Sequence, residues 1–101
     1  MLAPVRETFV ILREDLGLYA FSLLGLHFWS GLIDLEANGV VAFPSVNTAR
    51  LRVCEWNNGS DPDAYTYAPV STSTRYGFAT IEELQRAGLE RYIRKLRAPR
   101  Q

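Results

Sequence analysis

The residue types that most often carry out covalent chemistry are scarce in this chain, which has one histidine, His27, and one cysteine, Cys54. Together they could form a nucleophile and its general base, because a neighbouring base activates a thiol. Around Cys54, however, only Arg52 is placed to stabilise a thiolate. His27 stands beside Phe28 and Trp29, as a packed strand residue would. The single thiol excludes an internal disulfide and a C-x-x-C motif. We therefore expect no catalytic residues and no enzymatic activity.

A polar run at residues 57–63 offers oxygen atoms that could bind a metal. A calcium loop needs ligands at alternate positions and a distal bidentate glutamate. That glutamate is missing here, and Pro62 interrupts the spacing. The run is instead typical of a turn in which Asn and Asp side chains bond their own backbone. The glycines do not follow a phosphate-loop spacing, so we expect neither a metal nor a nucleotide cofactor.

Arginine and aromatic residues in the middle of the chain indicate a binding surface. Arg50, Arg52 and Trp56 would share one face of a strand, and Tyr65 and Tyr67 one face of the next. These residue types dominate protein–protein hot spots, and they also stack single-stranded bases. The plainer alternative places the rings at the rim of the core with their polar tips in water. The predicted partner-binding residues are Arg50, Arg52, Trp56, Asp61, Asp63, Tyr65, Tyr67 and Arg75.

Charge is balanced over the whole chain, with 11 basic and 11 acidic residues, but the C-terminal end is basic. Cations in the last turn of a helix interact favourably with its dipole, and the same cations could contact phosphates. The candidate phosphate contacts are Arg94, Lys95, Arg97 and Arg100. They support the alternative hypothesis of a nucleic-acid-binding regulator.

The first element is expected to be a helix over residues 4–24. Apolar residues recur there at spacings of three and four, which is typical of one helix face. Pro4 suits the first helical position, and Gly25 suits the position after the end. A strand over residues 9–13 is the competing interpretation, because that segment is rich in strand formers. The six periodic residues are Val5, Phe9, Leu12, Leu16, Tyr19 and Leu23.

Strands and a final helix are expected in the rest of the chain. Asn38-Gly39 predicts a hairpin turn between residues 27–36 and 40–43, and alternation predicts a strand over 49–56. A fourth strand over 64–68 and 70–76 would be interrupted at Pro69, which indicates a sheet edge or a bulge. Thr80 and Glu83 form a capping box that starts a helix, and Pro99 would end it.

This order predicts an α+β domain: a four-stranded antiparallel meander with N-terminal and C-terminal helices packed on one face, α-β-β-β-β-α. The 101 residues fit one domain, with residues 97–101 as a basic tail. Residues 17–33 carry no formal charge, but they fall short of the ~20 apolar residues that a spanning helix needs. No secretory signal is recognisable, and a lone thiol suits the cytoplasm.

The function expected from these features is a small, cytoplasmic, non-enzymatic protein that regulates or inhibits a partner protein by occluding it. Prokaryotic and phage inhibitors, immunity proteins, antitoxins and anti-defence factors are the general type, on grounds of size and composition alone. An enzyme built on His27 is the third hypothesis, after the nucleic-acid binder. We also expect that an edge strand near Pro69, or an open aromatic face, allows a homodimer.

Overall fold

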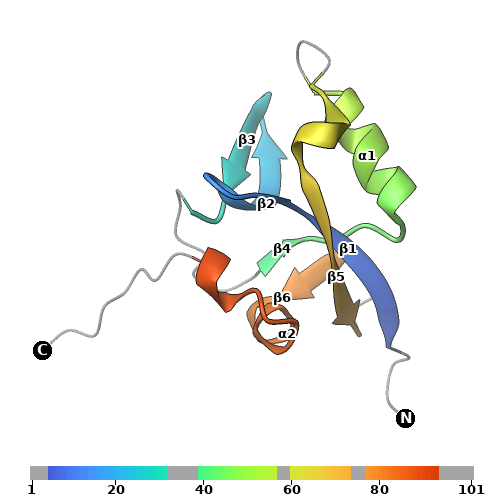
Figure 1. The fold of residues 1–101 in the computed structure, drawn as a ribbon, viewed down its shortest axis with the longest axis vertical. Coiled ribbons are helices and arrows are strands. Elements are labelled where there is room, and N and C mark those ends of the chain that lie inside the picture. The colour runs from blue at the N-terminus through green and yellow to red at the C-terminus, as the bar shows by residue number, and fades with distance from the viewer. Residues whose placement is uncertain (1–4, 32–38, 57–59, 74–76, 94–101) are drawn as a thin grey trace, which may run out of the picture.

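The computed structural model describes residues 5–31, 39–56, 60–73 and 77–93, which form a mixed helix and sheet fold (Figure 1). The larger sheet has four antiparallel strands in the order β3–β2–β1–β5, and β4 pairs with β6 in a smaller one. The strands are β1 (Arg6–Arg13), β2 (Gly17–Leu23), β3 (Leu26–Trp29), β4 (Gly39–Val41), β5 (Thr66–Thr72) and β6 (Phe78–Thr80). The helices are α1 (Val46–Cys54) and α2 (Ile81–Arg86), with 3-10 turns η1 (Pro62–Ala64) and η2 (Glu90–Tyr92). The α+β class and the four-stranded antiparallel sheet are confirmed, whereas the meander order is wrong.

The predicted helix over residues 4–24 is wrong, because its described part forms the antiparallel strands β1 and β2. β1 is apolar at successive residues because both of its faces are covered. Val10 and Leu12 belong to one core cluster and Ile11 to another, and successive side chains of a strand point to opposite faces. The apolar residues of a strand that is buried on both faces therefore happen to match the helical spacing. The competing strand over residues 9–13 lies within β1.

The predicted pairing of residues 27–36 with 40–43 does not occur in the described part of these segments, and residues 32–36 lie outside the described residues. β3 instead pairs with β2, and β4 pairs with β6. The expected Asn38 turn residue lies outside the described residues. The hairpin that does form has Leu24 and Gly25 as its two turn residues, with φ of 53° and 80°. Positive φ at both positions is the signature of the type I′ turn, which matches the twist of two-residue hairpins.

The predicted strand over residues 49–56 is a helix, α1, through Cys54. Ser45 caps its start, since the Ser45 hydroxyl accepts a hydrogen bond from the backbone N–H of Thr48. Ala49 and Val53 are buried, and Trp56 follows three residues later. That spacing of four and three is a helical stripe, which the alternation of charged and apolar residues concealed.

The C-terminal part follows the sequence signals more closely. β5 lies at the end of the sheet order, as Pro69 indicated. The capping box of Thr80 and Glu83 is present, although α2 ends at Arg86, well before Pro99. Gly88, with φ of 80°, explains this early end, because the N–H of Leu89 donates to the Leu84 carbonyl in the Schellman pattern.

Glu83 connects the start of α2 to the end of β5. Its buried carboxylate accepts from the backbone N–H groups of Ser73 and Thr80, at 2.8 and 2.9 Å. Burial alone would raise the pKa of Glu83, but these hydrogen bonds to the charged form outweigh it and lower the pKa.

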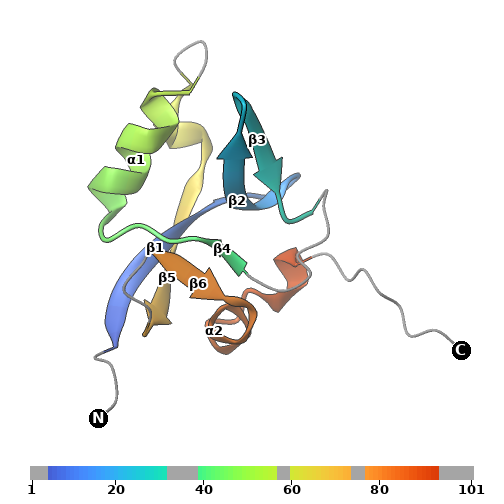
Figure 2. The ribbon, with the colours of Figure 1, turned by 180° about the vertical axis from the view of Figure 1, so that it is seen from behind.

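The two helices pack on different faces of the sheet. Ala49 and Val53 of α1 belong to the core cluster of Ile11, whereas Leu84 of α2 belongs to the cluster of Val10. Figure 1 and Figure 2 show α1 and α2 on either side of the region where β1 crosses β5. The predicted arrangement, with both helices on one face and the other face open, is therefore wrong. In the described part of the chain, neither helix is long and apolar enough to cross a membrane.

Candidate protein-binding surface

The predicted arginines lie on the exposed side of α1, not on a sheet. Arg50 Nη1 lies 2.8 Å from Asp63 Oδ1, so these two charges neutralise each other, and the hydrogen bond raises the pKa of Arg50. Arg52 lies over the Phe43 ring, with its guanidinium carbon 5.4 Å from the ring centroid. The guanidinium also reaches Glu55, at 3.7 Å from Nε. The structure therefore brings two of the residues predicted to bind a partner, Arg50 and Asp63, into contact with each other, as an exposed pair that contributes little to stability.

Trp56 does not present its ring to solvent, because only 7% of the residue is exposed. The ring packs against Tyr19, Trp29 and Tyr65, with centroids 5.1, 5.9 and 5.6 Å away. Its Nε1 is buried and has no hydrogen-bond partner among the described residues. The prediction of Trp56 as an exposed hot spot is corrected: it is a core residue that holds α1 against the sheet.

The predicted tyrosines are half-buried at the rim of this aromatic cluster. Tyr65 stacks on Trp29 with 5.9 Å between centroids and an interplanar angle of 13°. The Tyr67 hydroxyl donates to the Pro62 carbonyl at 2.6 Å, and burial raises its pKa. Asp61 caps η1 by accepting from the Asp63 N–H at 2.9 Å. The remaining predicted contacts lie outside the described residues: Arg75, Arg94, Lys95, Arg97 and Arg100.

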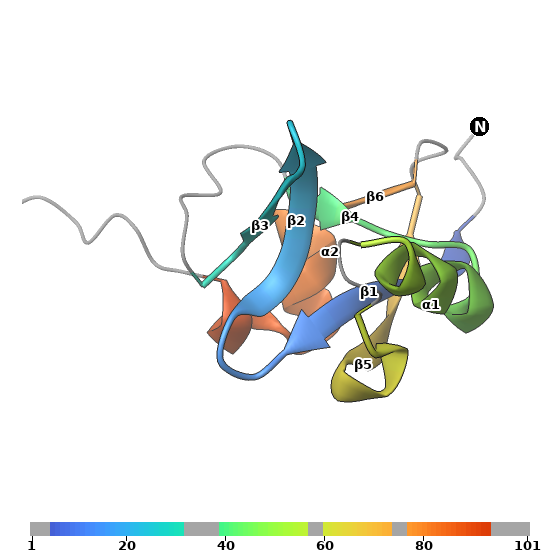
Figure 3. The ribbon, with the colours of Figure 1, turned by 90° about the horizontal axis from the view of Figure 1, so that it is seen from above.

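The exposed apolar surface lies elsewhere, on the outer half of the β2–β3 hairpin, residues 21–28, which we call the hairpin arm. In its register Phe21 faces Phe28 and Leu23 faces Leu26, while Ser22 and His27 alternate with them. Because alternate residues point to opposite faces, the four apolar side chains share one face. Figure 3 shows β2 and β3 extending away from the body of the molecule.

The apolar face of the hairpin arm is strongly exposed. Phe21 is 42% exposed, Leu23 57% and Leu26 62%, and the rings of Phe21 and Phe28 stack with centroids 4.8 Å apart. Leu24 at the turn is 91% exposed. An exposed apolar patch of this kind is often an interaction site.

Leu24 adopts a backbone conformation that its side chain disfavours. Its φ of 53° lies in the left-handed region, where a residue with a Cβ loses roughly 1–2 kcal/mol. Asn or Gly is the usual residue at this turn position. An exposed leucine in a strained turn neither packs in the core nor relieves the strain of the backbone. Its presence here favours a role for the side chain in contact with another molecule.

The polar face of the hairpin arm carries a short hydrogen-bonded chain. The Tyr19 hydroxyl lies 2.5 Å from Ser22 Oγ, which lies 2.8 Å from His27 Nδ1. The His27 ring lies over Trp56, with centroids 4.5 Å apart, and burial lowers the pKa of His27. The structure thus gives His27 contacts with Ser22 and Trp56, while Cys54 is exposed on α1.

Ser22 and His27 have the residue types of a nucleophile and its base, but a hydrogen-bonded pair does not by itself make a site for acyl transfer. Ser22 is exposed on a hairpin, and catalysis would need donors arranged around a developing oxyanion. The contacts instead fix the His27 ring over Trp56 and so attach the hairpin arm to the aromatic cluster.

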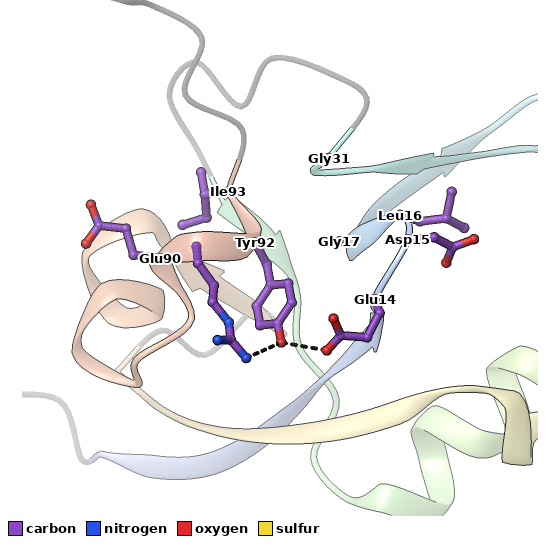
Figure 4. A pocket seen from close by; sticks show the side chains of 9 residues that line it. Glu14, Asp15, Leu16, Gly17, Gly31, Glu90, Tyr92 and Ile93 are labelled. Atoms are coloured by element: carbon purple, nitrogen blue, oxygen red, sulfur yellow. Dashed lines mark hydrogen bonds between the residues drawn. The ribbon is translucent and has the colours of Figure 1, made fainter.

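One hollow lies between the base of the β2–β3 hairpin and η2, with a volume of about 730 Å³. Figure 4 shows the Tyr92 hydroxyl between Glu14 and Arg91: it donates to Glu14 at 2.9 Å and accepts from Arg91 at 2.8 Å. Asp15 and Glu90 point away from the space in the same view. The inward polar groups therefore bind one another, and the described residues hold no group of three metal-ligating side chains.

Compared with known proteins, the chain matches no family model, no curated protein and no solved structure. A function can therefore be proposed only from the surface chemistry of the chain itself. Sequence reasoning missed the hairpin arm because residues 16–24 were interpreted as the end of a helix. The signal that could have found it was the pair Leu24-Gly25 between two apolar runs free of charge.

Proposed function

We propose that this chain is a non-enzymatic protein-binding module of the regulator or inhibitor type, which acts by occluding a surface of a partner protein. The observation that carries the proposal is the hairpin arm, where Phe21, Leu23 and Leu26 are exposed on one apolar face and Leu24 is exposed at the turn. The chain already has two buried core clusters, so this face is not needed to build the fold.

The energetics of the hairpin arm are sufficient for binding. Full burial of a Leu or Phe side chain contributes roughly 1.5–3 kcal/mol. Phe21, Leu23 and Leu26 are exposed by 42–62% and Leu24 by 91%, so together they offer several kcal/mol of further burial. After the entropic cost of association, a dissociation constant in roughly the micromolar range is expected.

The charge pattern distinguishes this mode of binding from nucleic-acid binding. Residues 16–31 contain no Asp, Glu, Lys or Arg, so a complex formed through the hairpin arm is held by apolar contact and changes little with salt. Contacts to phosphates would instead weaken steeply as salt rises. The nucleic-acid alternative depends mainly on cations outside the described residues, and no described contact favours it.

The exposed charges of α1 and η1 form a second, smaller part of the proposal. Arg52 and Asp61 are both exposed, and with Arg50 and Asp63 they could select a partner by charge. Because Arg50 and Asp63 already bind each other, we expect their replacement to change association rates and salt dependence more than affinity.

The test is affinity capture from lysate of the producing organism, comparing the wild type with Leu26→Ser and Leu51→Ser. Leu26 and Leu51 are both 62% exposed, but Leu26 is on the hairpin arm and Leu51 on α1. We expect a protein that is retained by the wild type and by Leu51→Ser at both low and high salt, and is lost with Leu26→Ser. Equal retention by both variants would remove the hairpin arm as the docking surface.

A further inference from the structure

We propose that a second copy of this chain covers the hairpin arm, through antiparallel pairing of β3 with β3 of the partner across a two-fold axis. The inference rests on the proposed function, since it names an occupant for the same surface. In this arrangement the apolar faces of two hairpin arms lie side by side, and another protein must compete with the dimer.

The first argument is the nature of the two sheet edges. β3 and β5 are the end strands of the described sheet. β5 carries Pro69, which cannot donate to a new strand and so protects that edge. β3 (Leu26–Trp29) has neither proline nor lysine, two common devices that keep an edge from pairing. Among the described strands, β3 is therefore the edge suited to accept another strand, which moves the predicted dimer contact away from Pro69.

The second argument is charge. A two-fold interface places a patch against the same patch of the other copy, so a patch with one sign of charge repels itself. Residues 16–31 carry no formal charge, and the formal net charge of the whole chain is zero. Neither local nor long-range repulsion therefore opposes the approach of two copies. A partner chosen by charge would be expected to meet a charged patch, which the hairpin arm lacks.

The third argument is geometry and size. Strand pairing across β3 continues the sheet from one copy into the other, as in β-strand addition. With the two-fold axis beside Leu26, Leu26 lies opposite Leu26 of the partner, and the exposed side chains of Phe21 and Leu23 lie on the same face of the continued sheet. Only one short edge strand and a few side chains take part. The total surface buried in the interface is therefore below about 1,200 Å², at the small end of the range for specific protein–protein interfaces. A weak, concentration-dependent dimer is the expected result.

The experiment measures the mass of the purified full chain by sedimentation equilibrium over a concentration series from about 1 μM to 1 mM. We expect the wild type to shift from monomer to dimer within this range, and Leu51→Glu to behave in the same way. Leu26→Glu should weaken the dimer at least tenfold, because it places two like charges together. Mixing Leu26→Glu with Leu26→Lys should restore a dimer that contains one copy of each. Circular dichroism establishes that each variant is folded.

The outcomes separate this inference from the proposed function. A wild type that remains monomeric at every concentration overturns the dimer, as does a dimer that Leu26→Glu leaves intact. If the wild type is monomeric but Leu26→Ser still loses a captured protein, the protein-binding function stands and its occupant is another protein. If the dimer forms and depends on Leu26, but capture is unaffected by Leu26→Ser, the inference stands and the docking of another protein on the hairpin arm fails.

Discussion

The two halves of the β2–β3 hairpin have the same kind of composition and opposite environments. Residues 17–20 of the inner half are all buried, and those of the outer half, the hairpin arm, are exposed at residues 21–26. Tyr19 and Trp29 in the inner half pack in a core cluster with Trp56. Phe21 and Leu23 in the outer half have no comparable cover. The difference teaches that burial along this hairpin depends on which other elements pack against each half, and not on residue type.

Trp56→Ala should have the largest effect, because it removes the ring that follows α1 and packs against Tyr19 and Trp29 of the inner half of the hairpin. A buried Trp→Ala change typically costs about 3–5 kcal/mol, and urea unfolding measures it. Leu24→Ala in the hairpin arm is the control and should leave stability within about 0.5 kcal/mol. A small loss at Trp56 would mean that the inner half does not depend on this cluster.

Two glycines with positive φ allow a second comparison of the inner and outer halves. Alanine at Gly17 would place its Cβ 2.6 Å from Ser30 Oγ and 2.7 Å from the Gly31 nitrogen. Gly25 at the turn has no atom within 4 Å of that position. Gly25→Ala should therefore cost only the backbone strain of about 1–2 kcal/mol, and Gly17→Ala about 1–3 kcal/mol more for overpacking. Equal losses in thermal and urea unfolding would contradict the close packing at the hairpin base.

Two serines provide the matched polar pair. Ser30 is fully buried, accepts from the Leu18 N–H at 2.8 Å and donates to the Tyr92 carbonyl. Ser30→Ala leaves buried groups without partners and should cost about 1–3 kcal/mol. Ser22 is itself exposed, so in Ser22→Ala water can replace its hydroxyl beside the Tyr19 hydroxyl and His27 Nδ1, and the cost should be smaller, about 0.5–1.5 kcal/mol. Hydrogen exchange of the Leu18 amide, faster only in Ser30→Ala, would localise the effect.

The smallest expected effect has the opposite sign. Leu24→Asn puts a residue that tolerates the left-handed region into the type I′ turn, and should stabilise the fold by roughly 0.5–1 kcal/mol. The same change removes the most exposed leucine of the hairpin arm, so partner capture and dimerisation should weaken as stability rises. Such a trade-off between stability and binding is common where a surface is kept for function. A variant that is both more stable and fully able to bind would show that Leu24 takes no part in docking.

The local signals in the sequence were sufficient where a few neighbouring residues determine the structure. The Thr80 and Glu83 capping box, the edge position of Pro69 and the α+β class could all be predicted, since each depends on short-range hydrogen bonding or on composition. The candidate site was not predictable in the same way: Trp56 is buried, and the hairpin arm was missed, because both depend on contacts between distant parts of the chain.

Only the tertiary structure determines the elements whose apolar residues fit both the helical and the strand period. β1 carries apolar residues on both of its faces because both faces are covered. The spacing of these apolar residues therefore resembles that of a helix. α1 alternates charged and apolar residues yet buries only Ala49 and Val53, so its pattern imitates a strand. Which faces are covered depends on contacts far apart in the chain, such as that of α1 with β1. The period of the apolar residues alone does not report such contacts, so only the tertiary structure shows antiparallel strands in place of the expected N-terminal helix and an exposed outer half of the β2–β3 hairpin.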